Sequence, residues 1–152
     1  MKNKDLFALY HGLEAVSKLG GARFSYGVSK NKKIIIEEIK TIEETNKLSD
    51  EFKAYDAARI ELCKEMSHKD EKGEAKMIGG NFDIIDRKAF DKAFEELKAE
   101  HQVAFDGYLK QQEDYNTLLD QESTIELFKI KQDILPEEMT STLLDPIFAV
   151  IE

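Results

Sequence analysis

The segment 86–122, DRKAFDKAFEELKAEHQVAFDGYLKQQEDYNTLLDQE, is the longest regular pattern in this chain and decides its fold. Mostly apolar and aromatic residues recur in it at every third or fourth position, and nearly everything between them is charged or amide-bearing. This pattern predicts a long amphipathic helix over 87–121 whose apolar stripe needs a partner. The stripe consists of Phe90, Phe94, Leu97, His101, Ala104, Tyr108, Gln111, Tyr115 and Leu118.

The best internal partner for this helix is a second amphipathic segment over 22–67. Its apolar positions begin at Phe24 and Val28 and continue with helical spacing. Ser49, followed by Asp50 and Glu51, is a typical helix start, so the segment either kinks near Leu48 or ends and restarts there. The register of the apolar positions shifts across Leu48, which favours a kink. The Gly-rich stretch 75–85 predicts a β-hairpin that connects the two segments. The expected fold is therefore mainly α with a small β element, built on a long antiparallel, coiled-coil-like helical hairpin.

Shorter elements are predicted at both ends of what we expect to be a single domain of 152 residues. A helix over 4–19 should stop at Gly20 and Gly21, which favour the left-handed conformation beyond a helix end. Alternation over 124–130 predicts a strand, and 140–151 predicts a last helix. We expect Gly27, inside the second segment, to mark a close helix–helix approach. The last helix carries a possible partner interface formed by Leu143, Leu144, Ile147, Phe148 and Ile151.

Charge is abundant and unevenly distributed. Charged residues make up 35% of the chain, well above the usual share of about 25%, which favours long exposed helices. The net charge is −9, yet residues 1–33 hold seven bases and two acids, so the remaining 119 residues carry −14. The basic third either packs beside acidic helices of the same or a sister chain, or contacts a phosphate or acidic partner.

The segment 23–33 combines bases with aromatic rings, a composition typical of surfaces that bind phosphate and stack on bases. Tyr26 has no place in the apolar stripe of its predicted helix. The candidate contact residues are Arg23, Tyr26, Lys30, Lys32 and Lys33. Because the whole chain is acidic, nucleic acid is nevertheless an unfavourable partner.

No residue pattern indicates catalysis or a bound cofactor. Cys63, the single cysteine, fits a small buried apolar position. Glu65 and His68 form one E-x-x-H step, whereas di-iron bundles use two. His101 lies on the stripe, where a polar residue can set the register of packing. Phosphate-loop, zinc-protease and nucleophile-elbow motifs are missing. We therefore expect a non-enzymatic protein without a metal or cofactor.

Neither a signal peptide nor a membrane-spanning stretch is expected, which predicts a cytoplasmic protein. Five segments together resemble small helical proteins of unknown function from tailed bacteriophages and prophages. They are Lys4–Leu6 with Leu9 and Leu13, Gly21–Tyr26, Lys30–Lys32, Asp70–Gly73 and Leu135–Glu138. The resemblance carries over no site residues. It implies a bacterial host cytoplasm, with association with the virion as an option, and a binding role.

Two functional hypotheses follow. The first is a phage-type protein-interaction or assembly accessory factor that self-associates as a homo-oligomer through apolar stripes. The alternative is a small acidic inhibitor of a host or defence protein, in which the −14 portion of the chain imitates the phosphates of nucleic acid.

Overall fold

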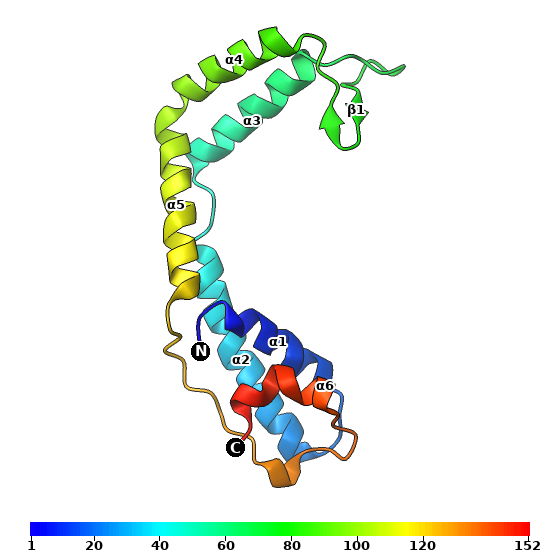
Figure 1. The fold of residues 1–152 in the computed structure, drawn as a ribbon, viewed down its shortest axis with the longest axis vertical. Coiled ribbons are helices and arrows are strands. Elements are labelled where there is room, and N and C mark those ends of the chain that lie inside the picture. Colours follow the sequence, from blue (N-terminus) through cyan, green and yellow to red (C-terminus); the bar gives the residue numbers. More distant parts are fainter. The chain divides into compact units, whose positions relative to one another are not determined.

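The computed structural model describes residues 1–152 and is mainly helical, with one two-stranded antiparallel sheet (Figure 1). The expectation of a mainly α protein with a small β element is confirmed. Where the length of the chain predicted one domain, its contacts divide it into two units, each compact in itself. Unit 1 comprises 1–46 and 113–152, and unit 2 comprises 47–112.

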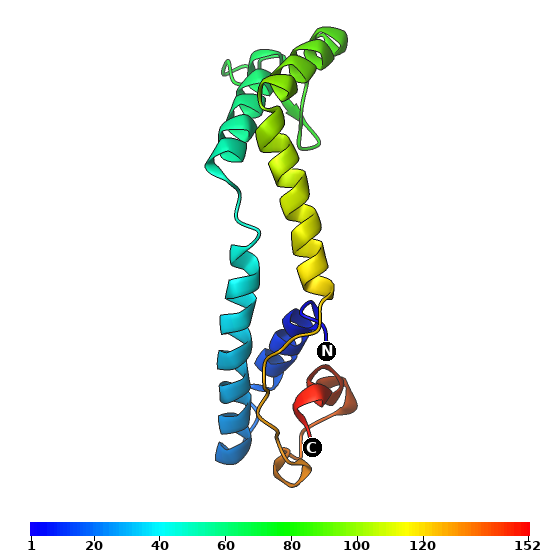
Figure 2. The ribbon, with the colours of Figure 1, turned by 90° about the vertical axis from the view of Figure 1, so that its left-hand side faces the viewer.

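Unit 1 contains the main hydrophobic core. Helix α1 (Asp5–Val16) lies between α2 (Ala22–Glu44) on one side and the C-terminal α6 (Ser141–Leu144) and 3-10 helix η2 (Asp145–Val150) on the other (Figure 2). Apolar residues at helical spacing bury one face of α1 and one face of α2. The core consists of Leu6, Leu9, Leu13, Val16, Phe24, Val28, Ile35, Ile39, Ile42, Ile130, Ile147 and Val150.

The predicted strand over 124–130 is wrong as an element, because no strand pairs with it along its length. The segment is extended, and the side chain of Asn31 bonds to it as a neighbouring strand would. Asn31 Nδ2 donates to the Phe128 carbonyl at 2.8 Å, and the Phe128 N–H donates to Asn31 Oδ1 at 2.8 Å. Only Ile130 forms a β-bridge, a parallel one with Ile151. Alternation of side chains thus arises from docking on α2 and not from a sheet.

Gly21 and Gly27 stand at positions of unit 1 where the chain turns or comes close to another segment. Helix α1 ends at Val16, three residues before the predicted end, and Gly21, with φ of 93°, precedes the first residue of α2. Gly27 was expected to mark a helix–helix approach, but its neighbour is the extended segment. A Cβ at Gly27 would lie 2.8 Å from Ile130 Cγ1, closer than two carbon atoms can approach.

The predicted helix over 140–151 is also shorter and tighter than expected. Four α-helical residues are followed by the 3-10 helix η2, which contains Pro146 in its first positions. Proline has no N–H to donate and its ring crowds the preceding turn, which favours this change of helix type. Pro146 is also pressed against α1, since a Cβ at Gly12 would lie 2.6 Å from Pro146 Cβ.

The N-terminus and the end of helix α5 (Gln102–Asp120) are joined within unit 1. The Asn3 and Lys4 amides donate to the carbonyls of Gln121 and Leu119 at 2.9 and 3.0 Å. Lys4 Nζ lies 2.8 Å from an Asp120 carboxylate oxygen, and Lys2 Nζ lies 3.2 Å from the same atom. Hydrogen bonding from Lys4, and then from Lys2, lowers the pKa of Asp120.

Unit 2 is a pair of helices with the β-hairpin at one end. Helix α3 (Asp50–Glu65) packs against α4 (Arg87–Glu100), and the two run in opposite directions (Figure 1). The predicted helix start at Ser49 is confirmed, since Ser49 Oγ accepts from the Phe52 amide. Asp86 caps α4 in the same way, with a carboxylate oxygen that accepts from the Ala89 amide. Strands β1 (Met77–Ile78) and β2 (Asn81–Phe82) form the predicted hairpin.

Both long helices of the sequence-based prediction are interrupted. The segment 22–67 is not one kinked helix, because α2 ends at Glu44 and α3 begins at Asp50. The helix predicted over 87–121 divides at His101, whose ψ of 23° departs from helical geometry. Neither proline nor glycine marks that position. The imidazole of His101 lies against the Tyr55 ring, with centroids 5.7 Å apart, so a contact within unit 2 accompanies the change of direction.

Candidate functional sites

A basic and aromatic pocket lies in unit 1, between the first turns of α2 and the segment 128–134. Its volume is about 360 Å3. Three side chains of its lining are cationic, two are aromatic and none is acidic. The lining consists of Ala22, Arg23, Tyr26, Phe128, Lys129, Lys131 and Ile134. Two of the five predicted contact residues, Arg23 and Tyr26, therefore meet here.

The aromatic pair of this pocket has a defined geometry. The rings of Tyr26 and Phe128 meet edge to face, with centroids 5.8 Å apart and planes at 89°. Lys30 Nζ lies 4.5 Å from the Phe128 centroid, a cation–π distance. Tyr26 is 62% exposed although it is large and apolar over most of its surface. Its exposure agrees with the sequence, which offered no core position for it.

The remaining predicted bases of α2 lie elsewhere. Lys32 faces α1, where its Nζ lies 3.3 Å from a Glu14 carboxylate oxygen and 5.5 Å from the Tyr10 centroid. This pair lies within the basic third itself, whereas the ion pairs of Lys2 and Lys4 with Asp120 join that third to the rest of the chain. Lys33 is exposed, forms no ion pair and does not line the pocket.

Sequence reasoning missed Phe128, Lys129 and Lys131. They come from a segment about a hundred residues away, which docks on α2 through the hydrogen bonds of Asn31 and the close packing of Ile130 against Gly27. The available signal in the sequence was the pair of lysines, Lys129 and Lys131, close to Phe128 at the end of the alternating segment. This again combines bases with an aromatic ring.

The predicted C-terminal interface is mostly covered by the chain itself. Ile147 is buried in the core of unit 1, so it is unavailable to a partner. Leu143, Leu144 and Ile151 are half-buried against the same core. The apolar stripe of this tail docks on α1. Helix α1 is too short to be stable unpaired, so it needs such a packing partner. Phe148 alone remains open, at 64% exposure.

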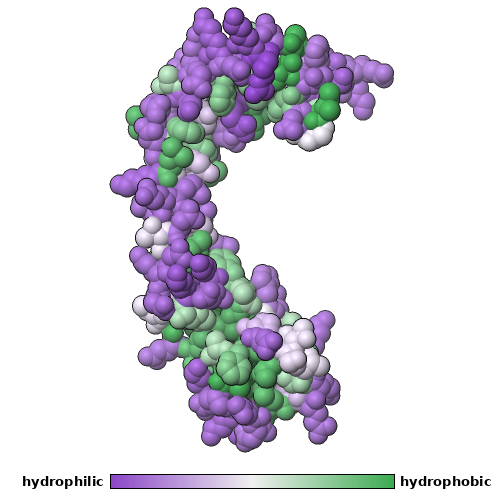
Figure 3. Space-filling view, viewed as in Figure 1, coloured by the Kyte–Doolittle hydropathy of each residue, from purple (hydrophilic) through white to green (hydrophobic).

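Unit 2 buries few apolar residues and exposes several. Only Tyr55, Cys63 and Phe90 are buried among its hydrophobic side chains, as expected for Cys63. The other members of the predicted stripe in unit 2 are half-buried. Figure 3 shows hydrophobic atoms at the surface near the β-hairpin. The large exposed residues of this unit are Leu48, Met77, Ile78, Ile85, Val103 and Leu109.

Several aromatic rings contact one another within unit 2. The rings of Phe52 and Tyr108 stack with centroids 4.1 Å apart, and Tyr55 meets Phe105 edge to face. Burial raises the pKa of the Tyr55 phenol. An open depression of about 590 Å3 lies beside Tyr108 and is lined also by His101 and Val103.

No group of three or more His, Cys, Asp or Glu side chains is arranged to hold a metal ion. His68 lies beyond the end of α3, where its backbone bonds to Asp83 and Lys76. None of the helices is both long and apolar enough to cross a bilayer. Comparison with protein-family models, with curated proteins and with solved structures finds no match to this chain.

Proposed function

We propose that this protein is a non-enzymatic interaction factor that self-associates through unit 2. The observation that carries the proposal is the unequal burial of the two units. Twelve of the fifteen buried hydrophobic residues belong to unit 1, although unit 2 contributes 66 residues of the chain. A unit that buries so little apolar surface of its own gains stability when a second surface covers it.

The chemistry of the exposed residues supports the same conclusion. Of the nine large hydrophobic residues that are exposed, six lie in unit 2. Val103 is 88% exposed at the start of α5, and Ile78 is 59% exposed on β1. Strand β1 has only β2 as a partner, and unpaired strand edges readily accept another chain. A second copy of the chain presents the same surfaces and gives a closed dimer by twofold symmetry.

An assembly role in a tailed bacteriophage remains the setting we propose for this activity, on the resemblance of the five segments above. The acidic-inhibitor alternative draws on the net charge of −9. A mimic of nucleic acid needs acids concentrated on one surface, whereas bases are interspersed with acids along both helices of unit 2. Ion pairs such as Lys64–Glu61 neutralise part of that charge. Self-association is therefore the better-supported function.

Size-exclusion chromatography with light scattering tests the proposal directly. We expect the wild-type chain to be an oligomer at micromolar concentration. Val103→Glu and Ile78→Glu should each shift it toward the monomer, because a buried unpaired carboxylate strongly disfavours an interface. Neither change should unfold the monomer, since both side chains are exposed in it.

Phe148→Glu is the matched control, because it also places a carboxylate at an exposed apolar residue, one that belongs to unit 1 and is 64% exposed. It should leave the mass of the oligomer unchanged. Dissociation by Phe148→Glu alone would transfer the interface to the C-terminal tail. A wild-type chain that stays monomeric at micromolar concentration would refute self-association, and salt-sensitive capture of a nucleic-acid-binding host protein would then favour the inhibitor.

A further inference from the structure

The basic and aromatic pocket of unit 1 has the composition of a ligand site, and it is independent of the surfaces proposed for self-association. We propose that it binds a small ligand in which a planar ring carries an anionic group, of the nucleoside monophosphate class. Tyr26 provides the stacking surface for the ring, and Arg23 and Lys131 bind the anion.

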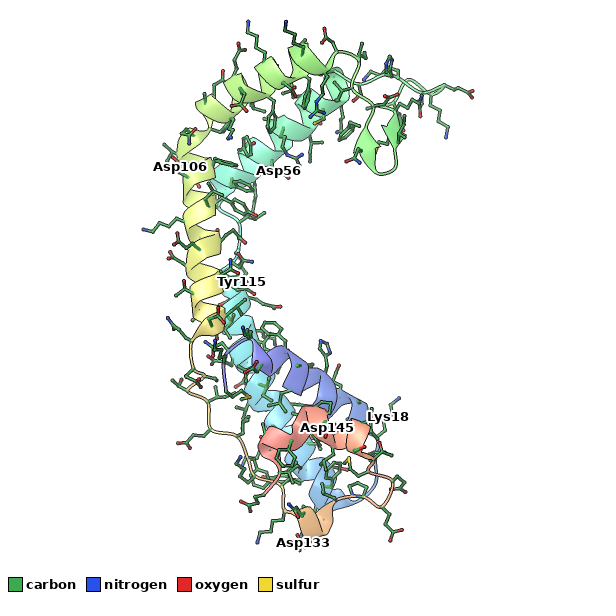
Figure 4. All side chains as sticks on the ribbon, viewed as in Figure 1. Lys18, Asp56, Asp106, Tyr115, Asp133 and Asp145 are labelled. Carbon is green, nitrogen blue, oxygen red and sulfur yellow. The ribbon has the colours of Figure 1, made fainter.

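The cations of this pocket are available to a ligand. The side chains of Arg23 and Lys131 form no ion pair and no hydrogen bond within the chain. Lys129 is held in place, since its Nζ donates to the Ala149 carbonyl at 2.8 Å. Asp133, labelled in Figure 4, lies in the short 3-10 helix η1 (Gln132–Ile134) and does not line the pocket. Two unpaired bases beside a third, without an acidic lining residue, favour an anion.

The aromatic rings of the pocket favour a ligand that is flat. The edge of one ring of the Tyr26–Phe128 pair meets the face of the other, and Lys30 lies over Phe128. Phe128 is therefore engaged, whereas Tyr26 is 62% exposed and available for stacking. A flat ring that stacks on an aromatic side chain gains affinity from that contact. An anion without a ring would leave this surface unused.

The size of the pocket and the charge of the chain decide between a single nucleotide and a polymer. About 360 Å3 lies at the lower end of ordinary small-ligand pockets, which hold roughly 300–1,000 Å3. A nucleic acid strand would extend beyond the pocket and meet a chain of net charge −9. Repulsion rises with the number of phosphates outside the basic patch. A ligand with one phosphate interacts with the local bases alone.

Isothermal titration calorimetry with AMP, adenosine and inorganic phosphate separates the two parts of the ligand. We expect AMP to bind, and adenosine and phosphate each to bind more weakly, because each lacks one of the two contacts. Arg23→Gln and Lys131→Gln should each weaken AMP binding about tenfold, since a hydrogen bond to a charged group contributes roughly 1.5–3 kcal/mol. Tyr26→Leu should weaken AMP more than phosphate.

Lys33→Gln is the control, as it removes the same charge from an exposed position of α2 outside the pocket. It should leave the affinity for AMP unchanged. Equal losses for Lys33→Gln and Arg23→Gln would overturn the site in favour of a diffuse charge effect. Tighter binding of a single-stranded oligonucleotide than of AMP would overturn the small ligand, and no heat with millimolar AMP would overturn the proposal entirely. All four substituted side chains are exposed, and thermal unfolding checks that each variant folds.

Discussion

Asn31 is the residue whose replacement should most directly test how unit 1 is closed. It is fully buried on the apolar face of α2 and occupies the position between Val28 and Ile35 where the stripe requires an apolar residue. The nitrogen and the oxygen of its side-chain amide each form a hydrogen bond with the backbone of Phe128, at 2.8 Å. Asn31→Ala removes two hydrogen bonds and leaves a backbone donor and an acceptor without partners.

The magnitude follows from these two bonds. A hydrogen bond contributes about 1 kcal/mol net, and an unsatisfied buried group costs about 1–3 kcal/mol. Because Phe128 is only half-buried, its backbone can regain some bonding from water, so we expect a loss near the lower end, about 2 kcal/mol. Urea unfolding followed by circular dichroism measures this loss. Ser29→Ala, at an exposed position of the same helix, should change stability by less than about 0.5 kcal/mol.

Asn31→Asp separates hydrogen bonding from simple packing. A carboxylate retains the acceptor for the Phe128 amide but places an anionic oxygen against the Phe128 carbonyl. Burial and this repulsion should raise the pKa of the introduced group in the folded state above its unfolded value of about 3.9. A protonated carboxyl can donate to the carbonyl, so its contribution is present at low pH and is lost as pH rises through the folded pKa.

Asn31→Asp should therefore be less stable than Asn31→Ala at neutral pH, and should recover relative to the wild type as the solution is acidified. Hydrogen exchange at the Phe128 amide locates the effect, because that amide loses its acceptor in Asn31→Ala and keeps one in Asn31→Asp. Unchanged protection of the Phe128 amide in Asn31→Ala, or equal stability of Asn31→Asp and wild type at pH 7, would falsify this account of the fold.

Three further predictions concern packing, pH and the two units. Gly27→Ala should destabilise the protein by about 1–3 kcal/mol, because Ile130 leaves no room for a methyl group. Gly107→Ala should stabilise it by up to about 1 kcal/mol, because nothing lies within 4 Å of the added Cβ. The urea midpoints of the two variants should therefore shift from that of the wild type in opposite directions. The pKa of Asp120 is lowered, so the bonds between Lys4 and the end of α5 should be present above the usual pKa of an aspartate and lost as pH falls through the folded pKa. Hydrogen exchange of the Lys4 amide should accelerate as pH falls through that pKa. Asp120→Asn should not show this acceleration. Amides of α3 and α4 should exchange faster than those of α1 and α2, and only the former should gain protection with protein concentration; uniform protection would contradict a thin core in unit 2.

The sequence predicted the local features well where a short-range interaction fixes them. Ser49 caps a helix as expected, and Asp86 does so in the same way, since a cap involves residues only three positions apart. The hairpin at 77–82 follows from Gly79 and Gly80, both of which adopt positive φ. The stripe of the predicted long helix is also correct, as each of its members is buried or half-buried.

Predictions that depended on distant partners failed or changed. The segment 124–130 alternates as a strand does, yet the side chain of Asn31 takes the place of a neighbouring strand. The helix expected to continue through His101 divides there without a proline or glycine, at a contact with Tyr55. Of the basic and aromatic pocket, the sequence indicated only the α2 side, Arg23 and Tyr26, because Lys131 reaches it through the same docking of a remote segment.

The sequence by itself determined the helical class of this protein, the starts of its helices and the apolar face of each, because helical periodicity and capping act over a few residues. Tertiary structure alone decided which faces are covered. It docked the C-terminal tail and the extended segment on α1 and α2, and it left the stripe beyond Phe90 only partly covered in unit 2. The physical reason is that an apolar stripe specifies only that it be buried, and the hydrophobic effect, being non-directional, leaves the choice of partner to the packing of the whole chain.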